Sequence, residues 1–220
     1  MVEKKLLHKK EVKIEISPQI TLSGTVHLPE EAHGIVLFAH GSGSSRLSPR
    51  NQFVAQFLQD AGVGTLLFDL LTPAEEKIDL VTRELRFNIP LLAERLIKAT
   101  EWVSKYKPAA SCTVGFFGAS TGAAAALIAA AEIGQKIKAV VSRGGRPDLA
   151  AQALERVQSP TLLIVGGDDV GVIELNQQAF NLLHCVKKME IVPHATHLFE
   201  EPGALEEVGR MASIWFNTYL

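Results

Sequence analysis

The sequence predicts a single α/β domain, in which a mostly parallel sheet is covered by helices on both faces. Short runs of consecutive apolar residues alternate with segments of helical periodicity from residue 34 onward. Continuous apolar runs are typical of strands buried on both faces, and their alternation with helices requires a mostly parallel sheet. The 220 residues fit one domain, and the chain contains no internal repeat, low-complexity tract or interdomain linker.

The first third of the chain predicts an antiparallel hairpin followed by the first parallel units. Residues 11–17 alternate apolar and charged side chains, and residues 20–28 return as a second strand after a turn. A continuous apolar run predicts a buried strand at residues 34–39. Apolar residues at helical spacing predict a helix at residues 49–61, and residues 62–71 form the next buried strand.

The remaining chain continues the alternation and brings the predicted sheet to eight strands. Charged residues are dense between residues 72 and 86, where no strand fits, so we expect a loop with a short helix. A further short helix is expected after the loop at residues 143–148. The other predicted helices lie at residues 89–106, 121–132, 172–183 and 205–218, and the other predicted strands at residues 112–117, 137–142, 160–165 and 188–192.

The most informative stretch runs from Ser111 to Glu132. Mostly β-favouring residues lead into Gly118-Ala119-Ser120-Thr121-Gly122, and an alanine-rich helix former follows directly. Strand, G-x-S-x-G and helix in this order are the context of a nucleophile elbow, a sharp turn that raises a serine hydroxyl above the sheet. Side chains at Gly118 and Gly122 would collide where strand, turn and helix crowd together. Ser120 is therefore the candidate nucleophile, and the alternative is a glycine-rich turn with an incidental serine.

A base and an acid for this serine are expected on other strand ends, because ligands of open α/β sheets bind at the carboxyl ends of the strands. His197 follows the last strand and is the candidate base. Asp168 and Asp169 follow the strand at residues 160–165, and either can turn toward the histidine. We favour Asp169, because the acid commonly lies a few residues beyond the strand and Asp168 suits a turn.

Other histidines offer alternatives to His197. His194 and His197 form an H-x-x-H pattern, which also fits a metal site, but no third ligand lies nearby in the sequence. Pro193 keeps His194 next to the strand end, which favours His197 as the base. His40 is expected to shape its own loop and not to transfer protons.

An acyl-transfer reaction also needs two donors directed at the developing oxyanion. The backbone N–H of Thr121, directly after Ser120, is the first candidate. The second is expected from the loop at residues 40–45, with Ser42 preferred and Gly41 next. Glycines such as Gly41 let this backbone approach a substrate closely. The alternative is a flexible tight turn.

Three arginines are candidates for binding a substrate carboxylate. Arg143 lies at a strand end beside Ser120, and Arg46 and Arg50 follow the glycine- and serine-rich loop. A structural ion pair with Asp148, Glu84 or Asp69 is at least an equal alternative for any one of them. Asp69 itself is expected to be a structural hydrogen-bond acceptor.

Composition and charge argue against several classes of function. The net charge of −2 gives no electrostatic footprint for nucleic acid or an anionic membrane. No apolar run is long enough to span a bilayer, and the N-terminal MVEKKLLHKKEVKIEI carries charges where an export signal needs an apolar core. Cys112 and Cys185 are expected as buried thiols and not as a disulfide. We therefore expect a cytoplasmic enzyme with a small-molecule substrate. The sequence makes no prediction of the oligomeric state.

These segments resemble the α/β-hydrolase superfamily, and more closely its dienelactone-hydrolase-like branch. The resemblance covers about residues 10–220 and depends chiefly on GASTGA and HATHLFEEPG, with support from HGSGSS, SRGGRPDLA and LLIVGGDDVGV. The order Ser, Asp, His is that of α/β-hydrolases and differs from that of chymotrypsin and subtilisin. The resemblance implies Ser120, Asp169 and His197 as the triad, hydrolysis of an ester or lactone, and no cofactor.

One departure from the branch bears on the substrate. Dienelactone hydrolases proper carry cysteine at the elbow, where this chain has Ser120, so a general carboxylic-ester hydrolase is favoured over a dienelactone hydrolase. The short segment from Arg143 to Ala153 suggests a minimal lid and therefore small or exposed acyl substrates. A thioesterase, a small-peptide hydrolase or a ligand-binding member of the fold without catalysis are the alternatives.

Overall fold

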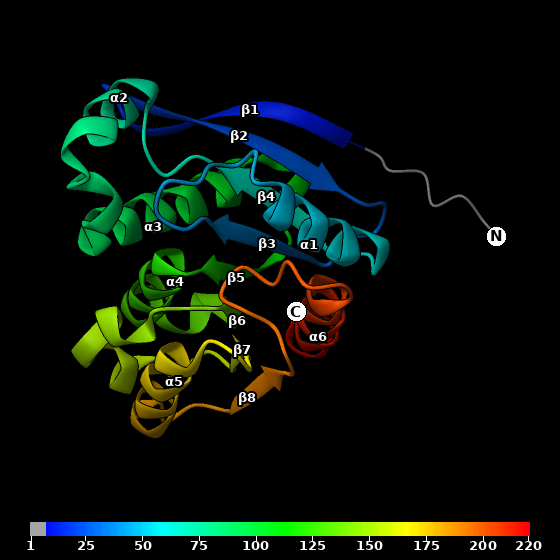
Figure 1. Cartoon of the computed structure of the whole chain (residues 1–220). Coiled ribbons are helices and arrows are strands. Elements are labelled where there is room, and N and C mark those ends of the chain that lie inside the picture. Colours follow the sequence, from blue (N-terminus) through cyan, green and yellow to red (C-terminus); the bar gives the residue numbers. More distant parts are fainter. Residues whose placement is uncertain (1–7) are drawn as a thin grey trace.

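In the computed structural model, which describes residues 8–220, eight strands form one sheet (Figure 1). The order across the sheet is β1-β2-β4-β3-β5-β6-β7-β8. The β1–β2 and β2–β4 pairs are antiparallel and all other neighbours are parallel, as predicted. The strands are β1 (His8–Ser17), β2 (Ile20–Leu28), β3 (Gly34–Ala39), β4 (Gly64–Phe68), β5 (Thr113–Ala119), β6 (Ile137–Arg143), β7 (Thr161–Gly166) and β8 (Lys187–Val192).

Helices cover both faces of this sheet. One buried apolar cluster joins the sheet to α3, α4 and α5, and a second joins the opposite face to α1 and α6 (Figure 1). The α-helices are α1 (Pro49–Asp60), α2 (Pro73–Thr82), α3 (Ile89–Lys105), α4 (Thr121–Ile133), α5 (Val170–Leu182) and α6 (Ala204–Tyr219). Short 3-10 helices are η1 (Leu85–Phe87), η2 (Lys107–Ala109), η3 (Gly134–Lys136) and η4 (Pro147–Arg156).

The segment at residues 72–86 is more helical than predicted, because its charged residues cap and anchor a helix. The Thr72 hydroxyl accepts a hydrogen bond from the Glu75 N–H at 3.2 Å, and the Glu75 carboxylate accepts one from the Thr72 N–H at 2.7 Å. This reciprocal capping box satisfies the free amides at the start of α2. Arg95 of α3, which is buried, donates to the other Glu75 oxygen at 2.7 Å. The charges that suggested a loop therefore fix α2 to the domain.

Close approach of α4 to the sheet determines where the functional residues lie. The alanines at residues 123–126 are fully buried, and β5, which leads into α4, lies near the centre of the sheet between β3 and β6. A Cβ atom at Gly122 would lie 2.1 Å from the Ala39 carbonyl oxygen and 2.6 Å from that of His40. Only glycine at residue 122 lets α4 begin directly over the end of β3.

Three other expectations concern the whole chain. Among residues 8–220 no helix is both apolar enough and long enough to cross a bilayer. Cys112 and Cys185 are free thiols, half-buried where full burial was expected, and burial raises the pKa of both. The expected lack of an export signal involves residues 1–7, which lie outside the described residues.

We expect Gly122→Ala to lower the free energy of unfolding by roughly 1–3 kcal/mol, because the added methyl group would overlap the Ala39 and His40 carbonyls. Gly171→Ala is the matched control, since a Cβ at this α5 position meets nothing within 4 Å. The control should be neutral or stabilising by up to about 1 kcal/mol. Urea denaturation followed by circular dichroism measures both. Equal stability of the two variants would contradict the close approach of α4 to β3.

Candidate active site

Ser120 occupies a strained turn between β5 and α4. Its backbone has φ 50° and ψ −121°, a region that non-glycine residues rarely adopt. Its N–H donates to the Arg143 carbonyl at 3.2 Å, and its carbonyl accepts from the N–H groups of Ala123 and Arg146, each at 3.1 Å. A Cβ at Gly118 would lie 2.4 Å from the Ala123 Cα. The turn is therefore crowded and fixed by backbone hydrogen bonds, which is the geometry of a nucleophile elbow.

The structure brings the predicted base and one of the two predicted acids to this serine. His197 Nδ1 lies 2.7 Å from Asp169 Oδ2, and His197 Nε2 lies 3.3 Å from Ser120 Oγ. A separation of 3.3 Å between base and nucleophile is within the range seen before substrate binds. The imidazole side chain is 38% exposed and the Asp169 side chain 18%. The histidine is thus open to a ligand while its carboxylate partner is largely covered.

Asp168 and His194 lie outside this arrangement. The Asp168 side chain is exposed, and the Asp168 N–H donates to the Ala195 carbonyl at 3.0 Å, as expected for a turn residue. His194 is exposed and adopts a left-handed backbone conformation with φ 60°. In the part of the chain that the structure describes, no group of three His, Cys, Asp or Glu residues is arranged to hold a metal ion.

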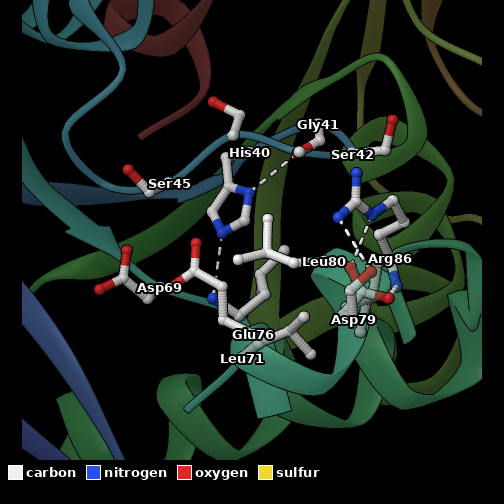
Figure 2. A pocket seen from close by; sticks show the side chains of 14 residues that line it. His40, Gly41, Ser42, Ser45, Asp69, Leu71, Glu76, Asp79, Leu80 and Arg86 are labelled. Atoms are coloured by element: carbon white, nitrogen blue, oxygen red, sulfur yellow. Dashed lines mark hydrogen bonds and ion pairs between the residues drawn. The ribbon is translucent and has the colours of Figure 1, made fainter. Parts of the chain in front are cut away.

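The predicted oxyanion donors lie next to the elbow. Thr121 is the first residue of α4, where backbone N–H groups have no acceptor within the helix and the helix dipole is positive. A Cβ at Gly41 would lie 3.1 Å from the Ser120 Cβ and 3.2 Å from the Ala119 carbonyl oxygen, so the Gly41 backbone packs against the elbow. Ser42 follows on the wall of the adjacent pocket (Figure 2).

His40 anchors the loop that carries these donors. Its Nε2 accepts a hydrogen bond from the Leu70 N–H at 3.1 Å, which leaves Nδ1 as the donor to the Gly41 carbonyl at 3.0 Å (Figure 2). Burial lowers the pKa of His40, so the ring is neutral near neutral pH. This agrees with the expectation that His40 shapes its loop. Its link to Leu70 at the end of β4 has no signal in the sequence.

The pocket beside this loop has a volume of about 110 Å³ (Figure 2). Neither Ser120 nor His197 lines it, so it adjoins the elbow through the loop of Gly41 and Ser42. Residues of α2 and η1 form its far wall, where Arg86 Nε donates to the Asp79 carboxylate at 2.6 Å. Four leucines supply apolar lining: Leu70, Leu71, Leu80 and Leu92.

The cover of this pocket differs from the lid expected at Arg143 to Ala153. That segment holds η4, which packs against α4 and α5. The wall over the pocket comes instead from α2 and η1, which lie in the segment predicted to be a loop with a short helix. Burial raises the pKa of Asp79, but hydrogen bonds from Arg86 and from the Leu85 N–H outweigh this effect and hold the pKa below its ordinary value.

Arg46 is not placed as a substrate-binding residue. Its backbone N–H and Nη1 each donate to the Asp69 carboxylate at 2.8 Å, and Nη2 lies 3.5 Å from a Glu11 oxygen. The alternative of a structural ion pair with Asp69 is the one that the structure supports. These contacts fix the loop after β3 to β1 and to the end of β4.

Arg143 is also directed elsewhere than predicted. It is 7% exposed, and its guanidinium lies 5.8 Å from the centre of the Phe199 ring. Its Nη2 donates to Asn51 Oδ1 at 3.4 Å, while Asp148 pairs with Arg146. The side chain is therefore enclosed beneath the loop that carries His197, which argues against the predicted contact with a substrate carboxylate.

Comparison with known proteins places this geometry in a family. No protein-family model matches the chain. Two curated Mycobacterium tuberculosis proteins, from strains CDC 1551 and H37Rv, are 53% identical over 214 residues, which are 97% of this chain and 47% of theirs. Both are provisionally named phosphoribosyl transferases. The chain thus spans about half the length of the curated relatives that it matches.

Solved structures match over the whole fold. A dienelactone hydrolase from Anabaena variabilis is 55% identical, with a TM-score of 0.95, and the match covers 97% of this chain and 98% of that one. Est1E from Butyrivibrio proteoclasticus is 15% identical, with a TM-score of 0.78 over 94% of this chain and 98% of that one, and shows the fold alone. Because the two chains are 55% identical over nearly the whole length of each, they are homologous. The chain belongs to the dienelactone-hydrolase-like α/β-hydrolases.

Proposed function

We propose that this chain is a serine hydrolase that cleaves small carboxylic esters or lactones through an acyl-enzyme on Ser120. One observation carries the proposal: His197 contacts the Asp169 carboxylate through Nδ1 and the Ser120 hydroxyl through Nε2, at 2.7 and 3.3 Å. A base that is oriented by an acid and lies within reach of a hydroxyl is the arrangement that activates a serine nucleophile.

The reaction divides into two acyl transfers. Ser120 Oγ attacks the carbonyl carbon while His197 Nε2 takes its proton, and the carbonyl electron pair moves onto oxygen. Collapse of this intermediate expels the alcohol oxygen, which takes the proton back from His197. In the second transfer, His197 takes a proton from water as the water attacks the acyl-enzyme. Collapse of this intermediate releases the carboxylic acid, and His197 returns the proton to Ser120 Oγ. Asp169 holds the Nδ1–H tautomer and stabilises the imidazolium.

The oxyanion of each intermediate is proposed to bind to two backbone N–H groups. Thr121 provides one from the first turn of α4, and Ser42, with Gly41 as the alternative, provides the other. His40 supports the second donor because its ring connects Gly41 to Leu70. Donors held in place before the reaction need no reorganisation as charge develops, which is where most of the rate enhancement is expected.

Apolar residues around the proposed triad favour a substrate with an apolar part. Val170 directly follows Asp169 and is 65% exposed, and Leu198 directly follows His197 and is 39% exposed. The adjacent pocket adds four leucines but has room only for a small group, at about 110 Å³. A short-chain or cyclic ester fits these features better than a long acyl chain.

Rival activities are separable by one substrate panel. A thioesterase would prefer acyl-CoA, a small-peptide hydrolase would prefer aminoacyl amides, and a binding protein would turn over none of the panel. The transferase name belongs to relatives that this chain matches over 47% of their length, and we assign hydrolysis, not that activity, to this chain. Consumption of phosphoribosyl pyrophosphate by this chain alone would contradict that assignment.

Ser120→Ala should reduce p-nitrophenyl acetate hydrolysis by roughly 10³-fold or more, because the nucleophile is removed. Labelling by a fluorophosphonate probe should disappear in the same variant. Ser104→Ala, on the exposed face of α3, is the matched control and should keep both signals. Full hydrolysis by folded Ser120→Ala protein would refute the acyl-enzyme.

Asp169→Asn should lower kcat by about 10⁴-fold, because an amide in place of the carboxylate favours the wrong histidine tautomer. Asp168→Asn is a neighbouring control with the same chemical change on an exposed side chain, and its kcat should stay within about two-fold of the wild type, as for other surface changes. Steady-state kinetics on one ester measures both. A larger loss in Asp168→Asn would reverse the assignment.

His40 should make the stability of the protein depend on pH. Because its pKa is lowered on folding from the ordinary value of 6.5, the unfolded chain binds more protons at mildly acidic pH. The contribution is therefore complete above about pH 6.5 and is lost as the pH falls toward the folded-state pKa. Urea denaturation at pH 5.5 and 7.5 should show a smaller pH dependence in His40→Gln than in the wild type. An unchanged pH dependence would exclude a buried neutral His40.

A further inference from the structure

The loop between β8 and α6 carries His197, and two of the side-chain contacts around it lie at the surface. Arg50 pairs with Glu200 at 3.0 Å, with side chains 34% and 63% exposed. Thr196 donates to Glu201 at 2.6 Å, also at an exposed position. Exposed ion pairs and hydrogen bonds constrain a loop weakly, because water competes for both partners. These contacts alone do not explain how the imidazole is kept at the hydroxyl.

The buried support for this loop is Arg143. Its guanidinium lies against the Phe199 ring at 5.8 Å, and Phe199, 1% exposed, is two residues beyond His197. Phe199 also has a left-handed backbone with φ 57°, a conformation that persists where the surroundings hold it. On its other side Arg143 donates to Asn51, which is buried in the first turn of α1. Arg143 therefore joins α1 to the His197 loop across the interior.

This arginine is an unusual buried charge. Among the described residues no carboxylate pairs with it, and its Nε has no hydrogen-bond partner. Burial, with a smaller effect of the Arg50 charge, lowers its pKa to about 10, so it remains protonated at neutral pH. Burying a cation without a carboxylate is costly, and an apolar side chain of similar length would avoid the cost. A role for the planar guanidinium is therefore required to explain its presence.

The backbone at Arg143 and Gly144 lies against both Ser120 and the loop that carries His197. The Arg143 carbonyl accepts the Ser120 N–H at 3.2 Å. The next residue, Gly144, has φ 50°, and a Cβ there would lie 3.1 Å from the His197 carbonyl oxygen and 3.3 Å from the Phe199 ring. The end of β6 thus lies between the elbow and the His197 loop, and a displacement of either would be transmitted through it.

We propose that Arg143 is a positioning residue, whose guanidinium, packed against Phe199, sets the separation between the His197 imidazole and the Ser120 hydroxyl. The inference rests on the proposed hydrolase function and adds a determinant of its geometry. A guanidinium over an aromatic ring, here at 5.8 Å from the ring centre, is a cation–π contact that a lysine ammonium on a flexible stem does not reproduce. A misplacement of about 1 Å between reacting groups can cost about 100-fold in rate.

The test compares Arg143→Met with the wild type on one ester substrate. Methionine keeps much of the length and removes the charge and the plane. The expected result is a kcat lower by roughly 10- to 100-fold with KM changed by less than about three-fold. Phe199→Leu should shift kcat in the same direction, and Arg143→Lys should rescue it only in part. Arg210→Met, which loses an exposed ion pair on α6, should match the wild type.

Two kinetic outcomes would overturn the proposal. A raised KM with unchanged kcat would make Arg143 a substrate-binding residue, as the sequence predicts. Unchanged kcat and KM in a folded Arg143→Met protein would leave it no part in the reaction. If Arg143→Met does not fold, Arg143→Lys and Phe199→Leu decide the question by the same split between kcat and KM.

A second readout separates this proposal from the hydrolase function. Amide hydrogen exchange over residues 194–200 should become at least about ten-fold faster in Arg143→Met, because local opening is easier when the buried support is removed. Unchanged exchange would refute the positioning role even in an active enzyme. A wild-type protein that fluorophosphonate does not label and that hydrolyses no ester would refute the hydrolase function, whatever the exchange result.

Discussion

The geometry of the proposed site depends on the close packing of backbone segments around Ser120. A non-glycine residue at φ 50° and ψ −121° costs of order 1–3 kcal/mol, and it persists because its surroundings allow no alternative. Gly118 and Gly122 remove the side chains that would separate β5, α4 and β3, and three backbone hydrogen bonds hold the turn. The direction of the hydroxyl is therefore set by main-chain packing. Every other group in the proposed site is placed relative to this fixed point.

Buried and partly buried ionisable groups near this point are of three kinds, one of which is the Arg143 cation without a carboxylate partner. Asp79 with Arg86, Asp69 with Arg46 and Glu75 with Arg95 are compensated pairs, and they hold the loops and helices that form the walls. His40 is neutral because burial lowers its pKa, and it uses both ring nitrogens as structural contacts. Few ionisable side chains near Ser120 are therefore left without a structural partner. Among the described residues, the one carboxylate within ion-pair distance of a histidine side chain is Asp169.

Local patterns in the sequence predict most of the fold and the residues of the proposed triad. Apolar runs locate the parallel strands, and the glycine spacing locates Ser120, because backbone packing imposes both patterns directly. The helix at residues 73–82 is longer than the short helix predicted there, because dense charge favours a loop, although Thr72 and Glu75 form a capping box that is readable in the sequence. Arg46 and Arg143 could not be assigned, because at a strand end a long side chain takes its direction from distant partners such as Glu11 and Phe199.

The separation between elbow and pocket has a consequence for how substrate preference can change. The proposed triad comes from the ends of β5, β7 and β8, whereas the far wall of the pocket comes from α2 and η1, which follow β4. That wall is attached by the Glu75–Arg95 and Asp79–Arg86 pairs, and none of these residues contacts the triad through a hydrogen bond in the described chain. Substitutions in the wall can therefore reshape the pocket while the distances among Ser120, His197 and Asp169 stay the same. The proposed triad and the far wall of the pocket therefore come from different parts of the chain, and the loop of Gly41 and Ser42 adjoins both.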